Sequence, residues 1–156
     1  MKLDRIDIDI LQALQRDAHV KAADLAESLG ISLSPFYRRI RLLEEAGVIT
    51  KYVSLLDQEK VGFPVTAYVS VAMEKSAAKL AAFERALLGC EEVMECYLMT
   101  GAFDYIVRVV ASDMAGIERF VMTRLATIEG VRDVSTSITL RRVQYKTVLP
   151  VREGGE

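Results

Sequence analysis

The sequence is poor in the residues that most catalytic and metal sites require. It contains one histidine, His19, and two cysteines, Cys90 and Cys96, whose separation does not match a C-x-x-C motif. Zinc sites and reactive thiols usually need such spacing or a neighbouring histidine, so both cysteines are expected to be packing or solvated residues. No nucleophile stands beside a base and no phosphate-binding loop is found. We therefore predict that the chain is not an enzyme and holds neither cofactor nor metal.

Long apolar runs and an excess of positive charge are also missing. No run approaches the roughly 18–20 residues of a membrane span, and the first four residues include charges where a signal peptide is apolar. These absences predict a cytoplasmic protein without membrane contact. The formal net charge is -2, whereas unselective binding of nucleic acid draws on a large positive field. Any contact with nucleic acid must therefore come from a local patch.

The composition is that of a folded protein. The chain of 156 residues is 51% hydrophobic and 27% charged, which suits a globular core and argues against a disordered chain. Its length allows one domain or two small ones, so the order of the motifs decides the domain organisation.

Three short helices are predicted in the first fifty residues. Asp4 is a candidate cap for a first helix to about Gln15, with Asp7 three positions later. A second helix is expected over residues 22–29, ending at Gly30. A third helix begins at Ser34-Pro35, with the serine as cap and the proline at the first helical position, and extends to about residue 46. Two short helices joined by a glycine-containing turn are typical of a helix-turn-helix, whose second helix enters the major groove.

The third helix has two different faces. Phe36, Tyr37, Ile40 and Leu43 are expected to pack inward, whereas the arginines project outward near the start of the helix. An arginine binds guanine bidentately or clamps a phosphate, and hydroxyls beside a helix N-terminus suit phosphate oxygens. A solvated arginine face is the alternative, but the preceding turn and the Ser-Pro start favour DNA. The candidate DNA-binding residues are Ser32, Ser34, Pro35, Phe36, Arg38, Arg39 and Arg41. Residues 48–53, rich in strand formers, are predicted as a wing strand and exit linker.

These motifs resemble the DNA-binding half of the Lrp/AsnC (feast/famine) transcription regulators. The likeness rests on Leu3-Asp4-Arg5-Ile6-Asp7, Gly30-Ile31-Ser32, Ser34-Pro35, Arg38-Arg39-Ile40 and Leu43-Glu44-Glu45-Ala46-Gly47-Val48-Ile49. It implies a winged helix-turn-helix and a regulator that binds double-stranded DNA. Lys21 departs from the family, which commonly has a Ser or Thr cap there, although Asp24 keeps the acid of the capping box.

The second half predicts the order β-α-β-β-α-β. The expected strands are Val65–Met73, Val93–Thr100, Phe103–Ala111 and Val131–Leu140. One helix is expected from a Ser76 cap to about Gly89, and another from Ser112 or Asp113 to about Glu129. This is the ferredoxin-like arrangement of four antiparallel strands with two helices on one face. The other face needs cover, so at least a dimer is expected.

A loop between the second and third strands is a candidate ligand site. In Met99-Thr100-Gly101-Ala102-Phe103-Asp104-Tyr105, glycine lets backbone amides approach a carboxylate, and Asp104 suits an ammonium group. From the residues alone a plain hairpin turn is the favoured alternative. The segment resembles the G-D-[FY]-D effector loop of the Lrp/AsnC regulatory domain, which implies an amino-acid effector. Ala102 replaces the usual first acid, so the effector's identity is left open.

The resemblance implies a set of effector positions and an overall organisation. The implied effector-binding residues are Thr100, Gly101, Ala102 and Asp104 in the loop, and Met114, Ser137, Ile138 and Thr139 as its facing wall. The fold is expected to be α+β, with a DNA-binding domain over 1–50, a linker over 51–63, and an effector-binding and oligomerisation domain over 64–156. A homodimer that assembles into an octamer is expected.

Two other classes of protein are alternatives. One is a ferredoxin-like small-molecule-binding protein whose N-terminal helices serve only for dimerisation. The other binds RNA on its sheet, but Phe103 and Tyr105 do not lie in an RNP-like octamer of basic and aromatic residues.

Overall fold

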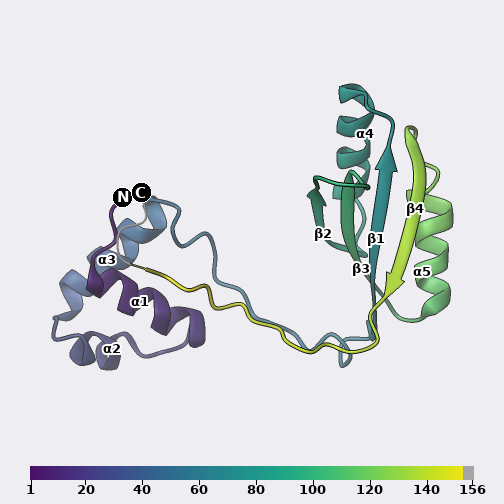
Figure 1. Ribbon diagram of the computed structural model, residues 1–156. Helices are drawn as coiled ribbons and strands as arrows, with labels where there is room; N and C mark the ends of the chain where they lie inside the picture. The colour runs from purple at the N-terminus through teal and green to yellow at the C-terminus, as the bar shows by residue number, and fades with distance from the viewer. Residues whose placement is uncertain (153–156) are drawn as a thin grey trace. The chain divides into compact units, whose positions relative to one another are not determined.

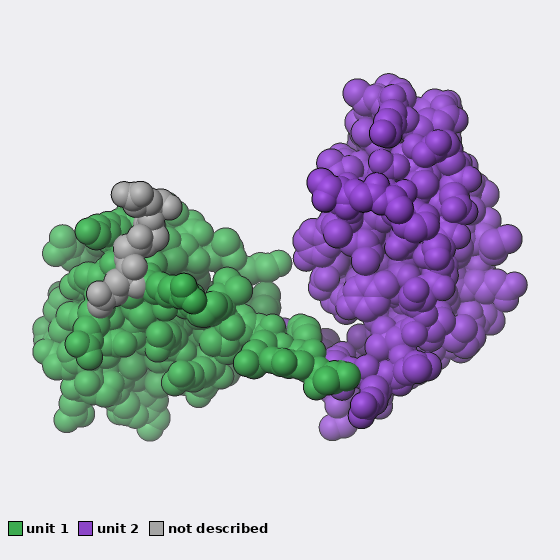
Figure 2. Space-filling view, in the orientation of Figure 1, with its two compact units in different colours: residues 1–54, 143–156 green, residues 55–142 purple. Residues whose placement is uncertain are grey.

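The computed structural model describes residues 1–152, which divide into two compact units (Figure 2). Unit 1 comprises Met1–Ser54 and the segment from Val143 onward, and unit 2 comprises Leu55–Arg142. The chain therefore passes between the units twice. Residues 153–156 of the predicted second domain lie outside the described residues. Within residues 1–152, no helix has the length and apolar character needed to cross a membrane.

Unit 1 contains the three predicted helices: α1 (Arg5–Arg16), α2 (Ala22–Ser28) and α3 (Leu33–Glu45) (Figure 1). The Asp4 carboxylate accepts the Asp7 amide at 2.9 Å, and the Asp7 carboxylate accepts the Asp4 amide at 3.1 Å. This reciprocal capping box confirms the predicted start of α1. Gly30 and Gly47 follow α2 and α3 with φ of 68° and 69°, a left-handed conformation that favours glycine.

The start of α3 differs from the prediction. The helix begins at Leu33, one residue before Ser34, so Pro35 is its third residue. Proline is tolerated there because the first-turn N–H groups have no partner within the helix. Ser32 occupies the cap position without making a capping hydrogen bond.

The wing strand predicted over residues 48–53 is wrong. Among the described residues, no strand lies between α3 and the first strand of unit 2. A strand requires a hydrogen-bonded neighbour, and a run of strand formers without one stays irregular. All of these residues except Ile49 are exposed.

Unit 1 also includes residues that follow the last strand of the chain. The Gln15 side chain accepts a hydrogen bond from the Leu149 amide at 2.6 Å and donates one to the Leu149 carbonyl at 3.3 Å. Val151 is partly buried against the apolar core of the three helices. The C-terminal segment is therefore part of the N-terminal unit.

Unit 2 has the predicted ferredoxin-like order. Strands β1 (Val65–Met73), β2 (Val93–Leu98), β3 (Tyr105–Ala111) and β4 (Val131–Ile138) form an antiparallel sheet in the order β2-β3-β1-β4. Helices α4 (Ala77–Leu88) and α5 (Met114–Phe120) pack on one face (Figure 1). Asp113 caps α5 through the Gly116 amide at 2.7 Å, whereas Ser76 makes no capping bond to α4. A π-helical turn, Val121–Leu125, continues α5 where one regular helix was expected.

The two faces of the sheet differ in burial. Val69, Val71, Val107 and Val109 are fully buried beneath the helices. On the opposite face, Tyr68 and Tyr97 remain 42% and 57% exposed. The single chain thus leaves aromatic side chains on its outer face in water, as predicted.

Candidate nucleic-acid interface and effector site

The exposed surface of α3 presents cations next to hydroxyls. Ser32, Ser34 and Pro35 are exposed at its start, and Arg38 and Arg41 follow within two turns. Arg38 has no hydrogen-bonded or ionic partner among the described residues, and Arg41 lies 3.6 Å from Glu45 with its side chain 70% exposed. An exposed pair at that distance holds its arginine weakly, so both guanidinium groups are available to an anion.

Arg39 is arranged differently from its two neighbours. Its Nη1 atom lies 2.7 Å from an Asp4 oxygen and 2.7 Å from an Asp7 oxygen, and its side chain is 28% exposed. The hydrogen bonds that Arg39 donates, first to Asp7 and then to Asp4, raise its pKa. The pKa of Asp4 is lowered, mainly because its carboxylate accepts a hydrogen bond from the Asp7 backbone amide. Arg39 lowers it further. Both shifts favour the charged forms of Asp4 and Arg39.

Two neighbouring aromatic residues of α3 are distributed otherwise than expected. Phe36, predicted both to pack inward and to contact DNA, is 3% exposed and packs in the core with Leu43, so its inward packing is confirmed. Tyr37, predicted to point inward, is 58% exposed. Its ring centroid lies 5.6 Å from that of Phe36, and the two rings are roughly perpendicular. Helical periodicity alone does not decide between adjacent positions at the edge of an apolar stripe. The aromatic group on the arginine surface is therefore Tyr37.

The candidate effector loop is held to the end of β1. Gly101 has a φ of 129°, a conformation that L side chains rarely adopt. One Asp104 carboxylate oxygen accepts the Met73 amide at 2.7 Å, and the Asp104 amide donates to the Val71 carbonyl at 2.9 Å. Thr100 and Ala102 are exposed beside it. Asp104 thus has a structural bond and a second oxygen that is not used in it.

The other candidate effector residues lie elsewhere in the unit. The loop ends at Tyr105, which pairs with Val71. Ser137 and Ile138 pair with Tyr68 and Ala67, and Thr139 donates to the Thr66 carbonyl. At about 3.3 Å per strand residue, roughly 10–16 Å of β1 separates the two groups.

Met114 lies at the same end of the sheet as the Ser137–Thr139 group. It begins α5 shortly after β3 ends at Ala111, whose partner is Val65. One chain therefore does not bring the loop and its predicted facing wall together.

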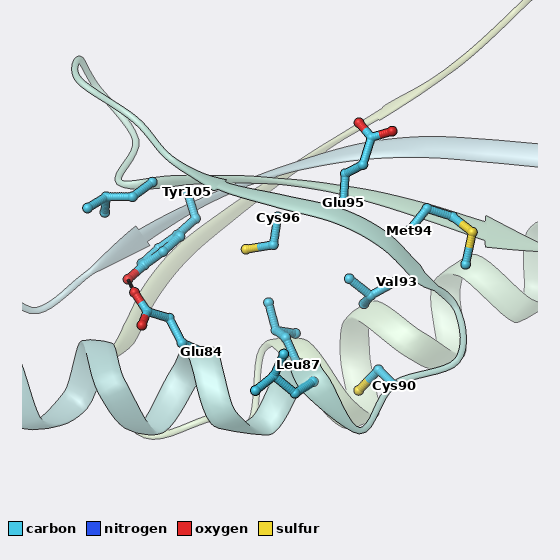
Figure 3. A pocket seen from close by; sticks show the side chains of 10 residues that line it. Glu84, Leu87, Cys90, Val93, Met94, Glu95, Cys96 and Tyr105 are labelled. Atoms are coloured by element: carbon cyan, nitrogen blue, oxygen red, sulfur yellow. Dashed lines mark hydrogen bonds between the residues drawn. The ribbon is translucent and has the colours of Figure 1, made fainter. Parts of the chain in front are cut away.

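A separate cavity of ≈ 490 Å³ lies between α4 and β2 (Figure 3). Its walls are mainly apolar, and the Tyr105 hydroxyl donates to Glu84 at 2.6 Å at one end. Burial raises the pKa of both Tyr105 and Cys96, so the thiol that lines the cavity stays protonated and is a weak nucleophile. None of the predicted effector residues lines this cavity. Among the described residues, no group of three or more metal-ligating side chains occurs.

Family models match both units. Residues 3–50 match a winged helix-turn-helix DNA-binding model, and residues 66–149 match the Lrp/AsnC ligand binding domain. Together the two models cover most of the chain in the order that the structure shows. The chain belongs to the Lrp/AsnC family of transcriptional regulators.

Relatives and solved structures agree over the full length. The Bkd operon transcriptional regulator of Pseudomonas aeruginosa is 38% identical over 151 residues, covering 96% of this chain and 99% of the relative. The leucine-responsive regulatory protein of Rhizobium meliloti is 37% identical over 145 residues, covering 92% and 93%. The crystal structure of a Neisseria meningitidis transcriptional regulator in complex with L-Met has a TM-score of 0.91 at 33% identity, covering 95% of this chain and 96% of that one.

These matches establish the class of function. The protein is a DNA-binding transcriptional regulator of the Lrp/AsnC type with a ligand-binding domain, in a family of regulators rather than enzymes. The alternative in which the N-terminal helices serve only for dimerisation is set aside by the DNA-binding match over residues 3–50.

Proposed function

We propose that the protein binds specific promoter sequences in the cytoplasm through α3 and that an amino acid controls this binding. The exposed Arg38 and Arg41 beside the start of α3 are the observation that carries the DNA-binding surface. Ser32, Ser34, Pro35 and Tyr37 complete it. Arginines on such a helix read guanine in the major groove or clamp a phosphate, and hydroxyls near a helix start contact phosphate. In this proposal residues 1–50 and the segment from Val143 form the DNA-binding domain, 51–63 the linker, and 64–142 the effector and oligomerisation domain.

The effector site is proposed to form between copies of the chain. Its two parts, the Thr100–Asp104 loop and the Met114 and Ser137–Thr139 group, lie at opposite ends of one sheet. A second copy that brings its own Ser137–Thr139 group to the loop would complete the site. The Asp104 oxygen that is not bonded to Met73 would accept a hydrogen bond from the ammonium group of the effector. Backbone amides near Gly101 would donate to the carboxylate of the effector. The L-Met complex of the Neisseria relative supports an amino acid as the ligand.

Assembly follows from the uncovered face of the sheet. Tyr68 and Tyr97 are exposed there, and a second copy of the same face would remove both from water. We propose a homodimer that assembles further to an octamer, so that several copies of α3 engage DNA together. Light scattering is expected to give the mass of a dimer or a higher multiple. A monomer at micromolar concentration would contradict the proposal.

Selection of DNA sites tests the DNA-binding part. Duplexes chosen from a random library by the full-length protein are expected to share a sequence, and gel shifts should show tighter binding to it than to random DNA. Arg38→Gln and Arg41→Gln should each weaken this binding. A selection that enriches no sequence would overturn the proposed DNA recognition.

A thermal-shift screen tests the effector part. A ligand that binds only the folded protein raises its melting temperature, so at least one of the twenty amino acids at millimolar concentration is expected to do so. Asp104→Asn should abolish the shift while leaving DNA binding intact. No response to any amino acid would remove the sensing proposal alone.

A further inference from the structure

We infer that Arg39 does not read DNA but fixes the orientation of the recognition helix, as a positioning residue linked to the N-terminus of α1. This inference rests on the proposed role of α3 in binding DNA and divides the three clustered arginines between two tasks. Arg38 and Arg41 face solvent, whereas the guanidinium of Arg39 bridges two carboxylates at 2.7 Å each.

The two carboxylates that bind Arg39 also cap the start of α1. Asp7 is 4% exposed, and one of its oxygens accepts the Asp4 amide while the other accepts Arg39. The carboxylate of Asp4 accepts the Asp7 amide and Arg39 in the same way. The capping box of α1 and the anchor of α3 are thus made by the same two carboxylates, each of which uses one oxygen for the box and the other for Arg39.

The charges of this cluster also argue against a phosphate contact. One arginine faces two aspartates, so the cluster carries a net negative charge and adds no positive field to the α3 surface. A phosphate would have to compete with two carboxylates, one of which is buried and would lose its counter-ion. Arg38, in contrast, has no carboxylate partner among the described residues with which a phosphate would compete.

Anchoring at Arg39 bears directly on recognition geometry. The anchor lies one residue beyond Arg38 and two before Arg41, in the middle of α3. Residues that contact base edges must be held within about 0.5 Å and 10–20° of the productive geometry. The helices of unit 1 are short, so a charge-assisted bond from α1 to the centre of α3 restricts both rotation and sliding of that helix.

A second substitution, at Asp7, distinguishes an Arg39 that positions α3 from an Arg39 that contacts DNA. In Arg39→Gln, the buried Asp7 carboxylate loses its partner, and binding to the selected DNA should weaken roughly tenfold or more. In Asp7→Asn/Arg39→Gln, the unpaired buried charge is gone and the two side-chain amides can hydrogen-bond to each other in place of the ion pair, so binding and the melting temperature should return part of the way to wild type. A guanidinium that contacted DNA would still be missing in the double variant, which would then bind as weakly as the single one.

The salt dependence gives a second readout. Loss of a phosphate contact lowers the slope of log K against log salt by about one unit. We expect this change for Arg38→Gln, the matched neighbour, and an unchanged slope for Arg39→Gln. Binding is measured on full-length protein well below its melting temperature, so that unfolding does not contribute. If Arg39→Gln does not fold, Asp4→Asn removes only the exposed half of the bridge and should weaken binding without changing the slope.

The outcomes are distinct. Rescue by Asp7→Asn with an unchanged slope supports the inference. A reduced slope without rescue would make Arg39 a DNA contact, and a lower melting temperature with unchanged affinity would make it a residue of stability only; either overturns the inference. Failure of the wild-type protein to select any DNA sequence would instead overturn the proposed function.

Discussion

Replacing Asp104 by alanine should destabilise unit 2 before any effector is considered. The carboxylate accepts the Met73 amide at 2.7 Å, and Met73 is fully buried at the end of β1. Loss of a hydrogen bond to a charged group costs roughly 1.5–3 kcal/mol. In a unit of this size each kcal/mol lowers the melting temperature by roughly 4–8 °C, so we expect a decrease of roughly 6–24 °C.

Thermal unfolding followed by circular dichroism measures this change. Asp133→Ala is the matched control, because that carboxylate lies on β4, is exposed and bonds only the amide of the next residue, Val134. Its effect should stay below roughly 4 °C. Asp104→Asn keeps an acceptor for the Met73 amide and should lie between the two. If Asp104→Ala melts together with the control, the bond to Met73 does not hold the loop and the reasoning fails.

Three further results are expected. Leu43→Ala removes a fully buried side chain from the core of unit 1; a cost of roughly 2–5 kcal/mol should abolish DNA binding while unit 2 stays folded, which amide exchange would show. Gly101→Ala should cost about 1–3 kcal/mol through its φ of 129°, since no atom lies within 4 Å of the added carbon; Gly89→Ala, with equal space and φ of -91°, should melt near wild type. The lowered pKa of Asp4 stabilises the fold above its ordinary value of 3.8, and this contribution is lost as the pH falls through the lower folded pKa; Asp4→Asn should flatten acid denaturation there, and identical curves would contradict it.

The parts of the fold that were predicted from the sequence depend on local signals. The Asp4 cap of α1 and the alternation of Val65–Met73 each involve residues close in the chain, and both are confirmed. The start of α3 was placed two residues late, at Pro35 instead of Leu33, because a Ser-Pro pair permits proline at more than one first-turn position. The wing strand failed because strand-forming residues do not specify whether a partner strand exists.

The candidate sites were less accessible to sequence reasoning, since they depend on distant contacts. The sequence offers no signal that separates Arg39 from Arg38, because the acids that bind Arg39 lie on another helix. Asp4 and Asp7 are distant from Arg39 in the sequence, and their ion pairs can be recognised only when the packing of α1 on α3 is known. The separation of the effector loop from Ser137–Thr139 follows from the register of β1 with both neighbours, which no short motif encodes.

The return of the C-terminal segment to unit 1 has a consequence for protein engineering. The DNA-binding unit is not a continuous stretch of sequence: Leu149 bonds to Gln15, and Val151 packs on the helical core. A chimera that grafts only the first fifty residues onto another sensor would uncover the surface on which Val151 packs. A regulator assembled from such parts needs both the opening helices and the closing segment, so the natural exchange unit of this architecture is the pair.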